Sequence, residues 1–198
     1  MKSDIILAGV GGQGILSIAA TIGMAALENH LHLKQAEVHG MSQRGGAVQS
    51  HLRISQSEIA SDLIPLGKAD LIISVEPMES LRYLPWLSEN GWLVTNTTPF
   101  VNIPDYPDMK ELLAEIEKLP HHIAINADEI ARQVKSPRSS NIVMLGASSP
   151  FLDLPYDSLE NGIKKIFGRK GDKIVQLNMD ALKAGREFAI DHTPVGSR

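Results

Sequence analysis

The segment Gly9-Val10-Gly11-Gly12-Gln13-Gly14 constrains the fold of this chain more than any other stretch. It follows the apolar run Ile5-Ile6-Leu7-Ala8 and precedes a helical pattern that begins at Ile15. A glycine-rich turn between a strand and a helix leaves backbone N–H groups uncovered at the positive end of the helix. Two interpretations stay open: a phosphate-binding loop of the dinucleotide type, and a tight turn whose glycines permit close packing without a ligand.

The rest of the chain alternates between apolar runs and helical patterns, which predicts an α/β fold. Strands are expected at 3–8, 31–38, 47–54, 69–75, 92–96 and 122–126, and one helix is expected to start at Glu76-Pro77 and stop at Asn90-Gly91. The alternation in 47–54 indicates a half-exposed strand, so the sheet is expected to be mixed. We expect a three-layer α/β/α sandwich with a mixed, mostly parallel sheet and a helical C-terminal part.

The domain organisation follows from length and pattern. The 198 residues suffice for a single domain, 1–198, with a Rossmann-like sheet core over 1–136 and a helical part over 137–191. Other helices of this prediction cover 13–29, 109–119, 128–134, 141–148, 157–167 and 175–190. No internal repeat interrupts this order.

Composition excludes several classes of function. A net charge of −4 gives no electrostatic basis for binding nucleic acid or an anionic membrane, and no apolar run is long enough to span a bilayer. The cytoplasm is the expected location. The chain has no cysteine, so it supplies no thiolate for zinc, an iron–sulfur cluster or nucleophilic catalysis. The seven histidines lack the spacing of a metal site, and no Ser–His–Asp arrangement is recognisable.

Two further features bear on a ligand. Dinucleotide binding requires an acid roughly 20 residues after the glycine turn, to hold a ribose hydroxyl, and Glu37 meets that spacing. The loop His39-Gly40-Met41-Ser42-Gln43-Arg44-Gly45-Gly46 then presents the Arg44 guanidinium between glycines, an arrangement suited to a carboxylate or a phosphate. A solvated loop arginine is the alternative interpretation of Arg44.

Five ordered blocks together resemble a known family. They are Gly9 to Gly14, His39 to Gly46, Ala69-Asp70 ahead of Glu76-Pro77-Met78-Glu79-Ser80-Leu81-Arg82, then Asn96, and Asn141-Ile142-Val143-Met144-Leu145-Gly146. The chain is similar over nearly its whole length to the gamma-type domain of 2-oxoacid:ferredoxin oxidoreductases. Within that family it is most similar to the beta subunits of the indolepyruvate branch.

The resemblance implies an accessory subunit of a heteromeric oxidoreductase. In that family a 2-oxoacid, here an aryl one such as indolepyruvate, is decarboxylated oxidatively on thiamine diphosphate. Electrons pass through iron–sulfur clusters to ferredoxin, and the acyl group passes to coenzyme A. This chain has neither cysteine nor a Gly-Asp-Gly motif for thiamine-bound Mg²⁺. The resemblance implies that these cofactors lie on a larger alpha subunit. No catalytic or metal-ligating residue is assigned to this chain. When isolated, the subunit can form a homodimer through the apolar surface that its partner would cover.

The predicted ligand or interface loops lie at the mouth of the partner's active site. Their residues are Gly9, Gly11, Gly12, Gln13, Gly14, His39, Gly40, Met41, Ser42, Gln43, Arg44, Gly45, Gly46, Asn96 and Asn141. Two alternatives of other classes stay open: a stand-alone NAD(P)-dependent oxidoreductase and a nucleotide-binding regulatory module.

Overall fold

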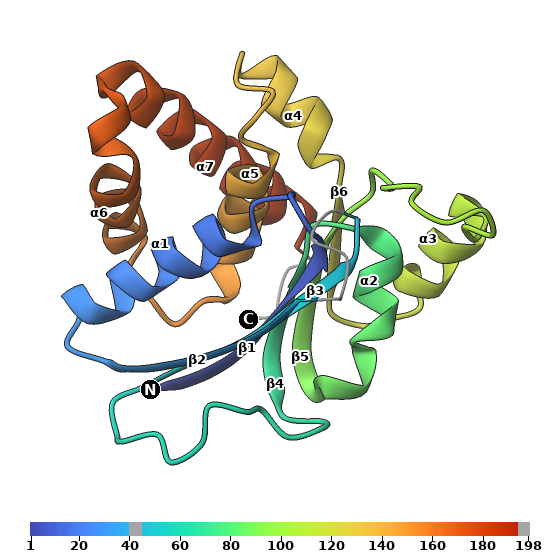
Figure 1. The fold of residues 1–198 in the computed structure, drawn as a ribbon, viewed down its shortest axis with the longest axis horizontal. Coiled ribbons are helices and arrows are strands. Elements are labelled where there is room, and N and C mark those ends of the chain that lie inside the picture. The colour runs from blue at the N-terminus through green and yellow to red at the C-terminus, as the bar shows by residue number, and fades with distance from the viewer. Residues whose placement is uncertain (40–44, 194–198) are drawn as a thin grey trace.

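A six-stranded sheet forms the centre of the computed structural model, which describes residues 1–39 and 45–193 (Figure 1). The strand order is β2-β3-β1-β4-β5-β6. Strands β1, β4, β5 and β6 are parallel neighbours, whereas β3 runs antiparallel to both β1 and β2. The expected mixed, mostly parallel sheet is confirmed. The strands are β1 (Lys2–Val10), β2 (His32–His39), β3 (Ala47–Ser55), β4 (Ala69–Ser74), β5 (Leu87–Asn96) and β6 (His122–Ile125).

Helices cover both faces of this sheet, which gives the expected three layers. Successive residues of β1 point to opposite faces, so Ile5 and Leu7 join one buried cluster while Ile6 and Ala8 join the other. The larger cluster lies beneath α1 (Ile15–Glu28), α4 (Ala127–Gln133), α5 (Ser140–Ser148), α6 (Tyr156–Phe167) and α7 (Asp172–His192). The smaller lies beneath α2 (Pro77–Arg82) and α3 (Met109–Glu117) on the other side (Figure 1).

The helix expected from Glu76 to about Asn90 is wrong in its second half. Helix α2 ends at Arg82, a 3₁₀ turn η1 follows at Leu84–Trp86, and β5 begins at Leu87. Pro85 explains the break, because proline lacks the N–H of an α-helical hydrogen bond and its ring clashes with the preceding turn. Asn90 and Gly91 therefore lie inside β5, where the register against β4 shifts between Ala69 and Leu71.

The C-terminal helices pack on the sheet instead of extending away from it. Helix α6 lies along α1, and α5 crosses α7 at Gly146 and Gly185. A Cβ added to Gly146 would lie 2.0 Å from the carbonyl oxygen of Leu182, and one added to Gly185 would lie 2.0 Å from that of Val143. The small residues of this part thus allow two helix backbones to touch. Two more 3₁₀ turns, η2 (Ser149–Phe151) and η3 (Gly168–Lys170), join these helices.

Candidate functional site

The predicted site residues that the structure describes gather at one edge of the sheet, the edge formed by the carboxyl ends of its parallel strands. The glycine turn follows β1, Glu76 follows β4 and Asn96 ends β5, while Gly45 and Gly46 precede the antiparallel β3. Helix α1 then covers one face of the sheet and α2 the other, so the chain diverges between β1 and β4. A crevice at such a point, outside the carboxyl ends of parallel strands, is where open α/β sheets bind ligands.

The glycine turn combines close packing with an uncapped helix end. A Cβ at Gly9 would lie 2.3 Å from the Val75 side chain, so this glycine is needed for packing. Gly12 and Gly14 have φ angles of 101° and 79°, which glycine adopts without strain. Among the described residues, the amides of these two glycines have no acceptor, and the first turn of α1 holds no acidic side chain. The positive end of α1 is therefore free to attract an anion.

Gln13 has a role within the chain that the sequence pattern did not reveal. Its Oε1 accepts a hydrogen bond from the Val10 amide at 2.7 Å, and its Nε2 donates to the Val75 carbonyl at 3.3 Å. One side-chain amide thus ties the carboxyl end of β1 to that of β4. This explains why a glutamine stands inside the glycine turn without assigning it to a ligand.

The second predicted loop joins the first through its described end. The Gly11 amide donates to the Gly46 carbonyl at 2.9 Å, and Asn102 Nδ2 donates to the Gly45 carbonyl at 2.5 Å. The backbone of His39 pairs with Val48 at the end of β2. Gly40, Met41, Ser42, Gln43 and Arg44 lie outside the described residues. The position of the Arg44 guanidinium therefore stays a prediction.

Asn96 is buried at this edge and its amide is satisfied within the chain. Its Oδ1 accepts from the amides of Thr98 (3.3 Å) and Ala127 (3.1 Å). Its Nδ2 donates to the Val75 carbonyl (3.3 Å) and to Asp128 Oδ2 (2.9 Å). These bonds join the ends of β4 and β5 to the start of α4, which is a positioning role.

Asn141, in the first turn of α5, contacts the residue that precedes α1. Its Nδ2 donates to the Gly14 carbonyl at 3.1 Å, and a Cβ at Gly14 would lie 2.5 Å from that nitrogen. The first turn of α5 therefore clamps the N-cap of α1. The sequence pattern placed both residues in the predicted site, and the structure brings them into contact.

A buried carboxylate that the sequence analysis did not assign organises the same edge. Glu76 is fully buried, caps α2 by accepting from the Glu79 amide at 2.9 Å, and accepts hydrogen bonds from the Phe100 amide and the Tyr106 hydroxyl. Burial and the neighbouring carboxylate raise the pKa of Tyr106. Burial also raises the pKa of Glu79, and the Arg82 guanidinium at 2.9 Å opposes this. The acid-then-proline pair at the start of a helix was the sequence signal for this cap.

The topology argues against the nicotinamide interpretation of Glu37. In a dinucleotide-binding sheet the acidic strand lies directly beside the first strand and parallel to it. Here antiparallel β3 lies between β1 and β2. Glu37 still lines a hollow of about 300 Å³ together with Gly11 and Gly12. Its strand β2, however, is separated from β1 by β3.

The chain matches the family model described as pyruvate ferredoxin/flavodoxin oxidoreductase over residues 4–188. It belongs to this family. An indolepyruvate oxidoreductase subunit IorB from Archaeoglobus fulgidus is 37% identical over 201 residues, covering 98% of both chains. A protein of the same description from Methanothermobacter thermautotrophicus is 35% identical, covering 93% of this chain and 96% of the relative. Neither relative extends far beyond the length of this chain.

Solved structures of oxoacid ferredoxin oxidoreductases share the fold. The gamma subunit of a keto/oxoacid ferredoxin oxidoreductase from Geobacter sulfurreducens has a TM-score of 0.71 at 24% identity, covering 96% of this chain and 99% of its own. A 2-oxoglutarate:ferredoxin oxidoreductase from Magnetococcus marinus, with 2-oxoglutarate, coenzyme A and succinyl-CoA bound, has a TM-score of 0.77 at 22% identity. The match covers 97% of this chain but 32% of the Magnetococcus chain.

The donor groups of this chain do not fit the iron–sulfur clusters of such enzymes. Thiamine diphosphate requires a bound Mg²⁺, and iron–sulfur clusters require thiolates. The sequence has no cysteine, and within residues 1–39 and 45–193 no three His, Asp or Glu side chains come together as a metal site.

The helices within residues 1–39 and 45–193 are all too short or too polar to cross a bilayer.

Proposed function

We propose that this chain is the accessory subunit of a heteromeric indolepyruvate-type 2-oxoacid oxidoreductase. The observation that carries the proposal is near-complete coverage of relatives that are named as subunits of indolepyruvate oxidoreductase. The chain lacks thiolates for a cluster, so a larger partner subunit holds the thiamine diphosphate and the clusters and passes electrons to ferredoxin.

The Magnetococcus enzyme supports the assembly of this fold with further parts of an oxidoreductase. There the same fold makes up about a third of a longer chain, so further parts of that chain accompany it. We infer that equivalent parts belong to a partner of this chain, because its relatives are described as subunits. We infer that the turn from Gly9 to Gly14 and the loop from His39 to Gly46 face this partner and complete the mouth of its active site.

The role of this edge is electrostatic positioning. The amides of Gly12 and Gly14, which have no acceptor among the described residues, lie at the positive end of α1, and the sequence carries Arg44 in the adjoining loop. Such donors bind a carboxylate of the oxoacid or a phosphate of coenzyme A before reaction. The chain therefore orients an anionic group of the substrate or of coenzyme A, and no chemical step takes place on its own residues.

Reconstitution with the larger subunit tests the assembly. The isolated chain is expected to be inactive, and the mixture is expected to reduce ferredoxin with indolepyruvate and coenzyme A. Two results would contradict the proposal. One is activity of the isolated chain with an oxoacid, and the other is saturable NADH binding, measured by tryptophan fluorescence.

Substitution of Arg44 tests the role of the loop within that complex. We expect Arg44→Ala to raise the KM for the oxoacid or for coenzyme A roughly tenfold, as the loss of one charge-assisted contact implies. Lys68→Ala is the matched control, because Lys68 is exposed and precedes β4, at the opposite edge of the sheet. Unchanged kcat and KM in Arg44→Ala would remove this residue from the site.

A further inference from the structure

A group of exposed apolar side chains lies at the same edge of the sheet as the glycine turn. The connection 97–108, between β5 and α3, leaves 42% of Phe100, 67% of Val101 and 42% of Ile103 exposed. Figure 1 shows this connection at the end of the sheet where β1 passes into α1. Single exposed apolar residues are common, but three within four positions form a patch of the kind that marks an interaction site.

Hydrogen bonds fix the backbone of this connection, so the apolar side chains are held outward. The Thr97 amide donates to the Ile125 carbonyl at 2.9 Å. The Phe100 amide donates to the buried carboxylate of Glu76 at 3.2 Å, and the Tyr106 hydroxyl donates to the same carboxylate. Three prolines within the connection restrict its φ angles further. A loop that is already ordered loses little conformational entropy when it binds a partner.

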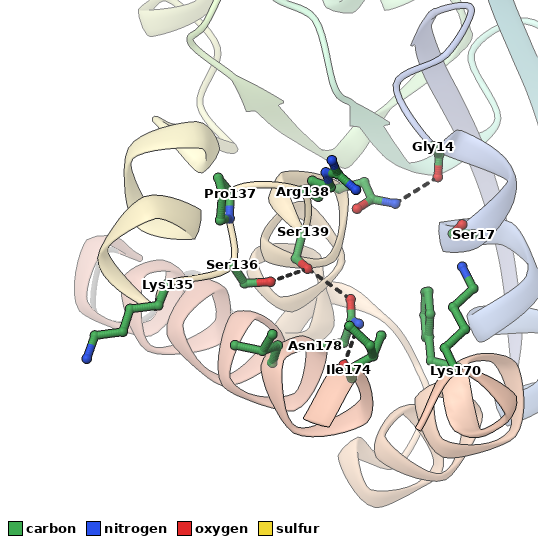
Figure 2. Close-up of a pocket in the computed structure, with 13 residues that line it drawn as sticks. Gly14, Ser17, Lys135, Ser136, Pro137, Arg138, Ser139, Lys170, Ile174 and Asn178 are labelled. Atoms are coloured by element: carbon green, nitrogen blue, oxygen red, sulfur yellow. Dashed lines mark hydrogen bonds between the residues drawn. The ribbon is translucent and has the colours of Figure 1, made fainter. Parts of the chain in front are cut away.

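The patch is continuous with the glycine turn. Asn102, inside the patch, donates from Nδ2 to the Gly45 carbonyl at 2.5 Å, and the Gly11 amide donates to the carbonyl of the residue after Gly45 at 2.9 Å. At the other end of the turn, Asn141 Nδ2 donates to the Gly14 carbonyl at 3.1 Å, the hydrogen bond drawn at Gly14 in Figure 2. The connection and the turn therefore form one surface joined by hydrogen bonds.

The shape of the patch suits a protein surface better than a small ligand. Small ligands are bound in concave sites. The hollow beside the glycine turn is lined by Leu16 and Glu37 among others, and none of the three patch residues lines it. Val101 is exposed over two thirds of its surface. An apolar side chain that projects in this way fits a pocket on another protein.

Charge argues against a second copy of this chain and against an anionic membrane as the occupant. The connection carries Asp105 and Asp108, both exposed, and no cation. Symmetric pairing through this loop would bring these carboxylates toward their own copies, and like charges across an interface lower the affinity. Anionic lipid head groups would be repelled in the same way. The matching surface is therefore apolar, with basic side chains at its rim.

We propose that the connection 97–108 is the main apolar contact between this chain and the larger subunit of the oxidoreductase. Phe100, Val101 and Ile103 enter an apolar groove of that subunit, and Asp105 and Asp108 face basic side chains at the rim of the groove. The proposal rests on the function proposed above, because that function supplies the partner. Relatives described as subunits, and the longer Magnetococcus chain in which further parts accompany this fold, support such a contact.

Binding of the full-length chain to the larger subunit, measured by biolayer interferometry, tests the proposal. Val101→Asp is expected to raise the Kd of the complex roughly tenfold or more, because it places a charge in an apolar groove. Phe100→Ala is expected to raise the Kd about tenfold, through the loss of an aromatic anchor. Leu66→Asp is the matched control and is expected to leave the Kd unchanged. Leu66 is 63% exposed in the loop 56–68, which lies at the opposite end of the sheet (Figure 1).

Steady-state activity separates assembly from chemistry. When this chain is limiting, the complex made with Val101→Asp is expected to be less active than that made with the wild type. At saturating concentrations of the variant, kcat and the KM for indolepyruvate are expected to equal the wild-type values, because the patch holds the subunits together and contacts no substrate. The substituted side chains are exposed, so the melting temperatures of the variants are expected to match that of the wild type.

Two results would overturn this assignment of the interface while the proposed function stands. Equal Kd values for the wild type, Val101→Asp and Leu66→Asp would place the contact elsewhere on the chain. A lowered kcat at saturating concentrations of Val101→Asp would assign the patch to the reaction instead of to assembly. Failure of the wild-type chain to bind the larger subunit would overturn both proposals, so the two kinds of failure are distinguishable.

Discussion

The crossing of α5 and α7 provides the sharpest test of the packing. Alanine normally stabilises a helix interior relative to glycine by about 1 kcal/mol. At Gly146 the added Cβ would lie 2.0 Å from the Leu182 carbonyl oxygen and 3.1 Å from the Arg186 amide nitrogen. Real Cβ atoms keep at least 3.0 Å from such atoms, so the two helix backbones must separate by about 1 Å.

The magnitude follows from the two opposing effects. Overpacking a core typically costs about 1–3 kcal/mol and occasionally more. Because the obstacle at Gly146 is backbone, which no rotamer change can remove, we assign the clash in Gly146→Ala a cost of about 4 kcal/mol. Subtracting the gain in helix propensity leaves a net loss of about 3 kcal/mol. For a chain of this size, the melting temperature is expected to fall by roughly 6–12 °C.

Thermal and urea unfolding, followed by circular dichroism, measure this loss. Gly185→Ala is expected to give a similar result, because its Cβ would lie 2.0 Å from the Val143 carbonyl oxygen. Gly168→Ala is the control, since its Cβ would meet nothing within 4 Å and its φ of −55° suits alanine. If Gly146→Ala melted at or above the temperature of the wild type, α5 and α7 would not touch at this point.

Two further predictions concern buried polar groups of β1 and β3. Burial lowers the pKa of His51, an effect that the nearby Arg53 strengthens and Asp62 opposes, and its Nδ1 accepts a hydrogen bond from the Ile64 amide at 3.0 Å. The unfolded chain then binds the proton more readily, so the free energy of unfolding should fall as the pH drops below about 7, by at most about 1.4 kcal/mol per pH unit. His51→Asn retains an acceptor and should flatten this slope in urea titrations; an unchanged slope would refute the assignment. The Arg53 guanidinium pairs with buried Asp4 at 2.7 and 3.1 Å, so Arg53→Met should lose about 3 kcal/mol in the same assay. Lys2→Met, which removes an exposed partner of Asp4, should lose less than about 1 kcal/mol, and equal losses would contradict the burial argument.

Local patterns predicted most elements because each pattern depends on residues close in sequence. The unbroken apolar run of β1 and the alternation of β3 identified both strands and the mixed sheet. Helix α7 starts at Asp172, three residues before its prediction, because its first turn is exposed and carries no apolar periodicity. The break at Pro85 follows a local rule, but in the sequence prediction the spacing of Leu81, Leu84 and Leu87, which suits one helical face, outweighed that rule.

Strand order was beyond reach of the same reasoning. The spacing of Glu37 after the glycine turn fits a dinucleotide site, but the insertion of β3 between β1 and β2 depends on pairing between distant segments. The roles of Gln13 and Glu76 were missed for the same reason. Their partners, Val75 for one and Phe100 and Tyr106 for the other, come next to them through the fold of the sheet.

The glycine turn illustrates how packing and ligand binding can be separated at single positions. Gly9 is accounted for by the Val75 side chain, and Gly14 by the Asn141 amide. Gly12 differs, because its φ of 101° requires glycine while nothing lies within 4 Å of where a Cβ would be. Internal packing therefore explains Gly9 and Gly14, and the Gly11 amide bonds to the Gly46 carbonyl, whereas exposed Gly12 has no such partner among the described residues. Gly12 is consequently the point in this turn at which an external group can approach the backbone most closely, whether that group belongs to a ligand or to the partner subunit.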